Sequence, residues 1–129
     1  MRHYALLSTG LLGLLLAGCR HDADLGPCYA GTVLGETCLD GVLIQVDEAY
    51  PIGKPAVYRI TSSDSLVGTN VVAAVNNPER FGVRGQRIYF TYSGSTDQHG
   101  PPQICTANTV RLDIPHLIAT NLSSNACAN

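Results

Sequence analysis

The chain has 129 residues and a net charge of −2, with 8 lysines and arginines against 10 aspartates and glutamates. This balance leaves no basic surplus for phosphate contacts and argues against a nucleic-acid partner. The length suits one small domain, not several.

The first eighteen residues have the three-part layout of an export signal. A positive start (Arg2, His3) precedes an apolar, mostly leucine run at 6–16, and two small residues follow. The run is too short for a comfortable membrane span, which needs about 20 apolar residues. We therefore predict a signal peptide at residues 1–18.

The signal ends in Leu-Ala-Gly-Cys at 16–19, which resembles the lipobox of bacterial lipoproteins. The resemblance implies cleavage before Cys19, a diacylglycerol on its thiol and an acylated amino group. Two or more acyl chains hold a protein stably on a membrane, so the expected location is the bacterial cell envelope. Arg20 follows Cys19 where an inner-membrane protein would carry aspartate, and this resemblance to enterobacterial sorting favours the outer membrane. An ordinary signal peptide or an uncleaved anchor is the alternative.

Residues 19–27 then form a lipidated tether, and residues 28–129 form a single domain. Four cysteines remain in that domain: Cys28, Cys38, Cys105 and Cys127. An even number in a small exported domain indicates disulfides, and four cysteines allow three pairings. No pair has the two-residue spacing of a zinc finger or a redox motif, so we expect no metal and no cofactor.

Apolar alternation and strand-forming residues predict five principal strands, at 28–37, 42–46, 70–75, 87–92 and 109–114. A shorter strand is expected at 57–60, and the last strand is expected to continue over 116–122 beyond Pro115. Asp40-Gly41 predicts a tight hairpin turn. The remaining segments are predicted to be a polar loop at 61–69, one helical turn at 78–81 and a long loop at 93–102.

Five strands favour a small antiparallel sheet or barrel. The run Val83–Phe90 (Val-Arg-Gly-Gln-Arg-Ile-Tyr-Phe) resembles the glycine-containing entry to the fourth strand of oligonucleotide/oligosaccharide-binding (OB) folds, and the opening hairpin is similar too. Over residues 28–124 this resemblance implies an all-β, five-stranded antiparallel OB-like barrel. An immunoglobulin-like β-sandwich, which needs about seven strands, is the alternative.

The OB resemblance also implies a disulfide pairing. In that fold the loops after strands one and four lie at one end of the barrel, whereas the start of strand one and the end of strand five lie near the other. Bridged cysteines need Cα atoms within about 7 Å. The resemblance therefore implies Cys38–Cys105 and Cys28–Cys127.

No residue pattern indicates catalysis. No serine lies in a Gly-x-Ser-x-Gly elbow, and the glycines at 82, 85 and 94 lack the spacing of a phosphate loop. Asp97 and His99 are the strongest acid/base or metal candidates, because they can converge within a loop, yet a solvated loop is the simpler interpretation. His116 is expected to pack or hydrogen-bond. Four arginines (80, 84, 87, 111) are too few for a nucleic-acid groove.

We therefore expect a protein that is not an enzyme. One hypothesis is a binding module that holds an envelope protein, peptide or glycan through residues 94–104 and 35–41, with Asp97, His99 and Gln103 in the contact. The alternative is a structural or inhibitory lipoprotein, which in size and disulfide usage resembles the small periplasmic lysozyme inhibitors. The sequence does not decide between them.

Overall fold

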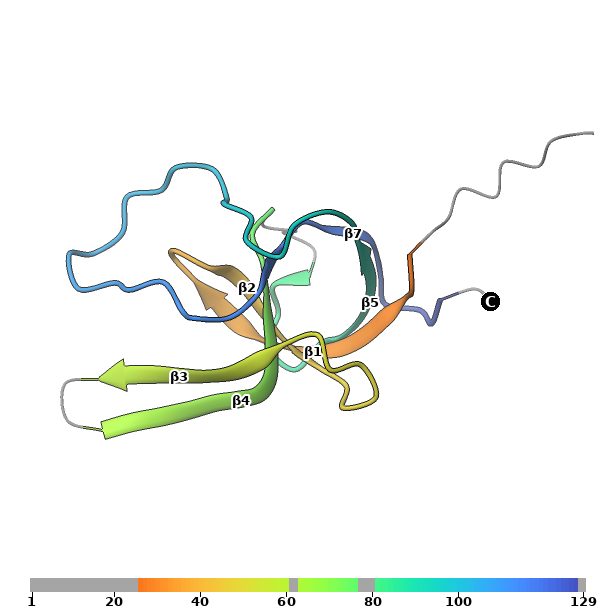
Figure 1. The fold of residues 1–129 in the computed structure, drawn as a ribbon, viewed down its shortest axis with the longest axis horizontal. Coiled ribbons are helices and arrows are strands. Elements are labelled where there is room, and N and C mark those ends of the chain that lie inside the picture. The colour runs from red at the N-terminus through yellow and green to blue at the C-terminus, as the bar shows by residue number, and fades with distance from the viewer. Residues whose placement is uncertain (1–25, 61–62, 77–80, 128–129) are drawn as a thin grey trace, which may run out of the picture.

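The computed structural model describes residues 26–60, 63–76 and 81–127. Its strands are β1 (Tyr29–Thr37), β2 (Gly41–Val46), β3 (Lys54–Ile60), β4 (Ser63–Ala74), β5 (Arg87–Tyr92), β6 (His116–Leu117) and β7 (Ala119–Ser123). They form one sheet in the order β3-β4-β2-β1-β5-β7 (Figure 1), and β6 pairs with β4 in parallel. The all-β expectation is confirmed. Cys19, the predicted signal at residues 1–18 and most of the helical turn expected at 78–81 lie outside the described residues.

The expected closed barrel of five strands is not formed. The last strand, which should close it, is broken at Ile118 into β6, which pairs with β4, and β7, which pairs with β5. Pro115 precedes β6 and has no amide hydrogen to donate, so only its carbonyl joins the ladder, where it accepts from Ala73 N at 2.9 Å. The immunoglobulin-like alternative is not observed either, because the described strands form one sheet and not two packed sheets.

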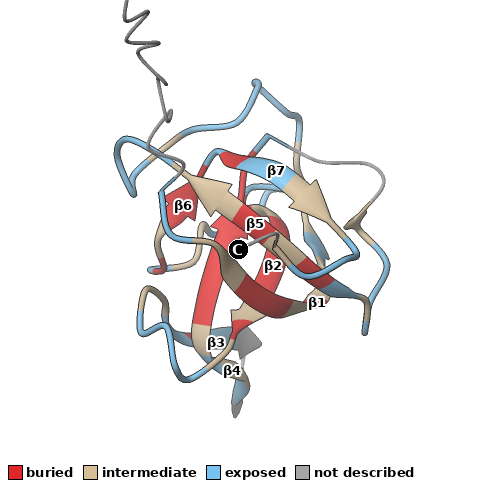
Figure 2. Ribbon diagram, turned by 90° about the vertical axis from the view of Figure 1, so that its right-hand side faces the viewer, coloured by how far each residue is buried: buried red, intermediate tan, exposed pale blue. Residues whose placement is uncertain are grey.

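The main core lies on one face of the central strands, as the alternation predicts. Val42, Ile44 and Val46 of β2 are buried there with Ile88 and Phe90 of β5. Figure 2 shows this concentration of buried residues on the central strands and the exposed loops around them. Each buried branched or aromatic side chain contributes about 1.5–3 kcal/mol through the hydrophobic effect, so this cluster is the main source of stability.

A second cluster covers the opposite face of β2 and β4, which the sequence did not predict. Leu43, Val71 and Ala73 are buried there with Ala56 of β3 and with Ile114. The cover comes from the antiparallel arm β3–β4, which extends away from the rest of the sheet (Figure 1). The polar loop expected at 61–69 is therefore wrong from Ser63 onward: polar residues suit a strand whose surfaces are largely solvated.

The strand expected at 109–114 is also wrong, because that segment pairs with no strand. Its alternation has another cause. Leu112 and Ile114 pack on the second cluster, whereas Val110 is 79% exposed. A side-chain hydrogen bond from Leu112 N to Asp40 Oδ1 holds its backbone in place of a ladder, so the period of two reflects packing.

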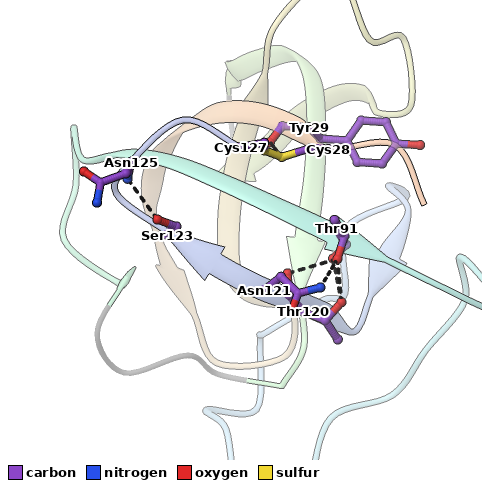
Figure 3. The surroundings of a disulfide bond; sticks show 8 residues. All are labelled: Cys28, Tyr29, Thr91, Thr120, Asn121, Ser123, Asn125 and Cys127. Carbon is purple, nitrogen blue, oxygen red and sulfur yellow. Dashed lines mark hydrogen bonds between the residues drawn. A yellow bond between two sulfur atoms is a disulfide. The ribbon is translucent and has the colours of Figure 1, made fainter. Parts of the chain in front are cut away.

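Both disulfides expected from the OB resemblance are present. Cys38 and Cys105 join the turn after β1 to the long loop after β5, with Cα atoms 5.8 Å apart. Cys28 and Cys127 join the start of β1 to the C-terminal end, with Cα atoms 6.2 Å apart. Figure 3 shows this second bridge beside Tyr29, with hydrogen bonds between Thr91 of β5 and residues of β7 below it.

Replacing Gly41 by alanine is expected to destabilise the domain more than replacing Gly85. Both glycines have a positive φ, 82° and 85°, which costs an alanine about 1 kcal/mol or more. Only at Gly41 would the added Cβ also collide with a backbone atom, the carbonyl oxygen of Ala74. We expect losses of about 1 kcal/mol for Gly85→Ala and about 2–3 kcal/mol for Gly41→Ala, measured by urea unfolding. Equal losses would contradict a close approach of β2 to β4 at Gly41.

Candidate functional site

A shallow depression lies between the turn after β1 and the long loop at 93–115, where the sequence places the contact surface. Its volume is about 200 Å³. The turn lines it with residues 38–41, the long loop lines it with residues 99–103 and Arg111, and Val75, which follows β4, completes the lining. The disulfide Cys38–Cys105 crosses between the two segments. Two loops far apart in sequence thus form one surface.

The structure places the three residues of the expected binding loop at or beside this depression. His99 and Gln103 line it. Asp97 does not, but its Oδ1 accepts a hydrogen bond at 3.0 Å from Arg111 Nη1, and Arg111 does line it. Gln103 Oε1 lies 3.9 Å from the disulfide sulfur of Cys38. All three residues are on or near the solvated surface, as the sequence predicts for a loop.

Arg111 connects this surface and was not singled out from the sequence as part of it. Its Nη2 donates to the carbonyl of Gln98, and its Nη1 lies 3.4 Å from His99 Nε2. A guanidinium has no acceptor, so His99 Nε2 faces Arg111 as the acceptor. This arrangement orients His99 but occupies the nitrogen that a base would need, and so it favours binding over proton transfer.

The arginines considered for a nucleic-acid surface are engaged at separate places. Arg87 on β5 donates to both carboxylate oxygens of Asp47, and these hydrogen bonds hold the pKa of Asp47 below its usual value. Arg84 lines a different groove. Arg111 is held by Asp97, so Arg84, Arg87 and Arg111 each have a different contact, and Arg80 lies outside the described residues.

Beneath the depression lies a buried acid–histidine pair, Asp40 and His116. Each residue is only 2% exposed. Asp40 Oδ1 accepts from His116 Nε2 at 2.8 Å and from Leu112 N at 2.9 Å, and Oδ2 accepts from Thr37 Oγ1 at 2.8 Å. The pair therefore ties the β1–β2 turn to β6 and to the end of the long loop.

The environment of Asp40 favours its ionised form. Burial alone raises the pKa of a carboxyl group, but the hydrogen bonds from His116, Thr37 and Leu112 outweigh burial and lower the pKa of Asp40 below its ordinary value. His116 Nδ1 lies 2.7 Å from the carbonyl oxygen of Ile114, so both ring nitrogens are occupied within the protein. A ring without a free nitrogen cannot take a proton from a substrate. The pair is therefore structural.

A second groove of about 370 Å³ lies between the β3–β4 arm and the end of β1. Leu34, Leu66 and Tyr58 contribute apolar surface to it. Burial, and then the charge of Asp40, raise the pKa of Tyr58. Asp40 thus lies close to both hollows. It lines the first one itself, and its charge acts on Tyr58, which lines the second.

Three further findings bear on the class of the protein. Within residues 26–60, 63–76 and 81–127 no group of three or more histidine, cysteine or acidic side chains is placed to hold a metal ion. The same described residues contain no helix that is long and apolar enough to cross a membrane. Comparison of the chain with models of known protein families, with curated proteins and with solved structures finds no match.

Proposed function

We propose that the protein is a non-catalytic binding domain held in the bacterial envelope by lipid on Cys19. Its contact surface is formed by residues 94–104 and 35–41. The observation that supports the proposal is the convergence of these two segments around one depression and their covalent link through Cys38–Cys105. A cross-linked surface loses less conformational freedom when it binds, so more of the contact energy remains as affinity.

The chemistry of the surface suits a protein or peptide partner. Leu39 and Ile104 flank the disulfide and are 37% and 103% exposed. Beside them Arg111 and His99 offer polar groups at the depression. Apolar side chains with an adjoining arginine are the usual composition of a protein interface centre, and the depression is large enough for one partner side chain.

The surface lies at the opposite end of β1 from the tether. β1 has 9 residues and so spans about 30 Å, from the Cys28 end to the turn that holds Cys38. In Figure 1 the long loop and the β1–β2 turn lie at the left, and the C-terminal end lies at the right with the start of β1. A lipid on Cys19 would therefore leave the contact surface facing away from the bilayer, toward a partner in the envelope space.

We also propose an OB-like origin for the connectivity, although the sheet is open. β1 pairs with β2 and β5, β2 pairs with β4, and the broken strand β6–β7 joins β4 in parallel and β5 antiparallel. These are the neighbour relations that the five strands of an OB fold have, with β3 as an added arm. The loops after the first and fourth strands of such folds are ligand-binding loops, which supports the choice of surface.

Site-specific photo-crosslinking in cells tests the contact surface. A photoreactive residue at Ile104 is expected to give a discrete covalent adduct with an envelope partner, whereas the same residue at exposed Thr120 on β7 is not. Replacing His99 and Gln103 by alanine is expected to reduce the Ile104 adduct about tenfold or more, since two interface contacts of about 1 kcal/mol are lost. Adducts of equal yield from both positions, or an Ile104 adduct that persists in the double variant, would contradict the proposal.

The identity of the adduct decides between a general binding module and an inhibitor. If the partner is a lysozyme, the purified domain is expected to abolish the lysozyme activity at stoichiometric concentration. The domain with both His99 and Gln103 replaced by alanine is expected to leave that activity unchanged. A non-hydrolase partner, with no loss of activity across several lysozymes, would remove the inhibitor alternative and leave the binding module.

A further inference from the structure

The outer half of the β3–β4 arm exposes apolar side chains that the two hydrophobic clusters leave uncovered. Ala56 of β3 is 1% exposed and packs in the second cluster, but Val57 and Tyr58 beyond it are 37% and 39% exposed. Leu66, which pairs with Val57 across the arm, is 62% exposed. An isolated two-stranded ribbon is only marginally stable in water, and Figure 1 shows the arm extending away from the rest of the sheet. The arm therefore has apolar surface available for a further contact.

The groove beside the arm is open because one of its lining residues has no side chain. Leu34, Leu43 and Val67, which belong to the second cluster or pack against it, line its apolar part. Gly35 lines it too, and a Cβ added at Gly35 would meet no atom within 4 Å. The second cluster is therefore left partly uncovered along a groove of about 370 Å³, which is large enough to receive apolar side chains of a partner.

The same groove holds one acid and one base. Glu36 on β1 and Arg84, in the turn before β5, both line it, and both are exposed. The turn is hydrogen-bonded to β1, so the two residues lie on neighbouring segments. Within residues 26–60, 63–76 and 81–127 neither charge takes part in an ion pair. By contrast, an aspartate pairs with each of Lys54, Arg87 and Arg111.

An apolar groove with one acid and one base is complementary to a second copy of itself. A two-fold axis that passes between Glu36 and Arg84 brings Glu36 of each copy opposite the partner's Arg84, so the same ion pair forms twice. Val83, next to Arg84 in the chain, is 68% exposed and is covered by the same contact.

Other ligands fit the two charges less well. A lipid or another uncharged apolar ligand would leave both charges unpaired, and a ligand of one charge sign would be repelled by one of them. A peptide would need an acid and a base at the matching distance, which symmetry supplies in a second copy. The charges of the groove therefore favour a second copy of this chain.

We propose that the groove is a dimerisation surface, on which two copies of the chain pack about a two-fold axis with Glu36 of each copy facing the partner's Arg84. The β3–β4 arms contribute the apolar contact, and the two ion pairs set the register. Of the segment 35–41, residues 35–37 line this groove and residues 38–41 line the depression, and the two hollows share no lining residue. Dimerisation therefore does not rest on the proposed function.

Sedimentation equilibrium of the full-length, disulfide-bonded protein, in a detergent whose density the solvent matches, measures the protein mass alone. We expect a reversible equilibrium between one and two chains, with a dissociation constant below about 100 μM. The mass is expected to stop at two chains because a two-fold contact is closed. A mass of one chain at all concentrations up to about 100 μM, or a mass that grows beyond two chains, would overturn the proposal.

Charge reversal tests the register. Glu36→Arg and Arg84→Glu are each expected to weaken dimerisation at least about tenfold, because each creates two like-charge contacts across the axis. An equimolar mixture of the two variants is expected to dimerise as well as wild type, since every reversed charge then faces its opposite. Glu48→Arg, the same change at an exposed acid outside the groove, is the matched control and should leave the mass unchanged. Wild-type dimerisation of either single variant, or a mixture that stays monomeric, would show that this surface is not the interface.

Crosslinking in cells identifies the occupant of the groove directly. A photoreactive residue at Leu66 in a tagged full-length chain is expected to form an adduct with a second, differently tagged copy. The same residue at Val110, which is 79% exposed and does not line the groove, is expected to give no such adduct. A Leu66 adduct with a different protein, and none with the second copy, would assign the groove to another partner and contradict dimerisation. Neither this result nor the wild-type mass depends on the folding of the charge-reversed variants or on the Ile104 crosslink.

Discussion

Replacing Asp40 by alanine is expected to lower the free energy of unfolding by about 3–5 kcal/mol, because three groups lose their shared acceptor and each unsatisfied buried polar group costs about 1–3 kcal/mol. The substitution leaves His116 Nε2, Leu112 N and Thr37 Oγ1 without the acceptor that each of them uses. Water cannot replace it readily, because the site is 2% exposed. A small domain has only about 5–15 kcal/mol in total, so the variant should unfold at much lower urea concentration.

The control is Asp113→Ala, at a carboxylate whose side chain is fully exposed although it lies 3.4 Å from Lys54 Nζ. We expect no measurable change there, because solvated ion pairs contribute little.

The pH dependence gives a second check on Asp40. The pKa of Asp40 is lower in the folded protein than its ordinary value of 3.8. Its ionised form therefore contributes its full stabilisation above about pH 4, and the contribution is lost as the pH falls through the lowered pKa. The difference between wild type and Asp40→Ala should thus shrink in acid below pH 4. A difference that does not change with pH, or a loss below 1 kcal/mol at pH 7, would contradict this account.

The strands of the main core could be predicted from sequence because apolar side chains recur at every second position on one face. In β5, Ile88 and Phe90 alternate with less buried positions, and in β2 the apolar positions Val42, Ile44 and Val46 keep the same period although Leu43 on the other face is buried too. The strand prediction was wrong where the burial of alternate side chains had another cause. Leu112 and Ile114 alternate because they cover the second cluster from a segment that pairs with no strand. Only part of the β3–β4 arm was predicted, because the polar residues of its exposed strands do not show an alternation of apolar and polar positions.

The candidate site was partly predictable for a different reason. The OB resemblance brings the loops after the first and fourth strands together, and the disulfide Cys38–Cys105 shows that they meet. The pair beneath them could not be predicted. Asp40 in an Asp-Gly step has a sufficient explanation as a turn residue, and its partner His116 lies far along the chain. Only the three-dimensional structure shows that the turn residue is buried and that its carboxylate accepts three hydrogen bonds.

Removal of both disulfides is expected to unfold the domain, whereas removal of either one leaves it folded. The bridges are nested: Cys38–Cys105, with a sequence separation of 67, lies inside Cys28–Cys127, with a separation of 99. In the chain-entropy model the inner bridge alone is worth about 4.4 kcal/mol. Once it is closed, the outer bridge closes an effective loop of only about 32 residues and adds about 3.7 kcal/mol.

The two terms together come to about 8 kcal/mol, within the range of the whole stability of a small domain. Losing one bridge costs about half of this, because the other still restrains most of the unfolded chain. Urea unfolding of Cys28→Ser/Cys127→Ser, Cys38→Ser/Cys105→Ser and the quadruple variant measures the three states. Cooperative unfolding of the quadruple variant within about 2 kcal/mol of wild type would show that the core of β2 and β5 carries the fold without them. The expected unfolding of the quadruple variant would instead make the domain dependent on an oxidising compartment, which is the environment expected from the export signal predicted at residues 1–18.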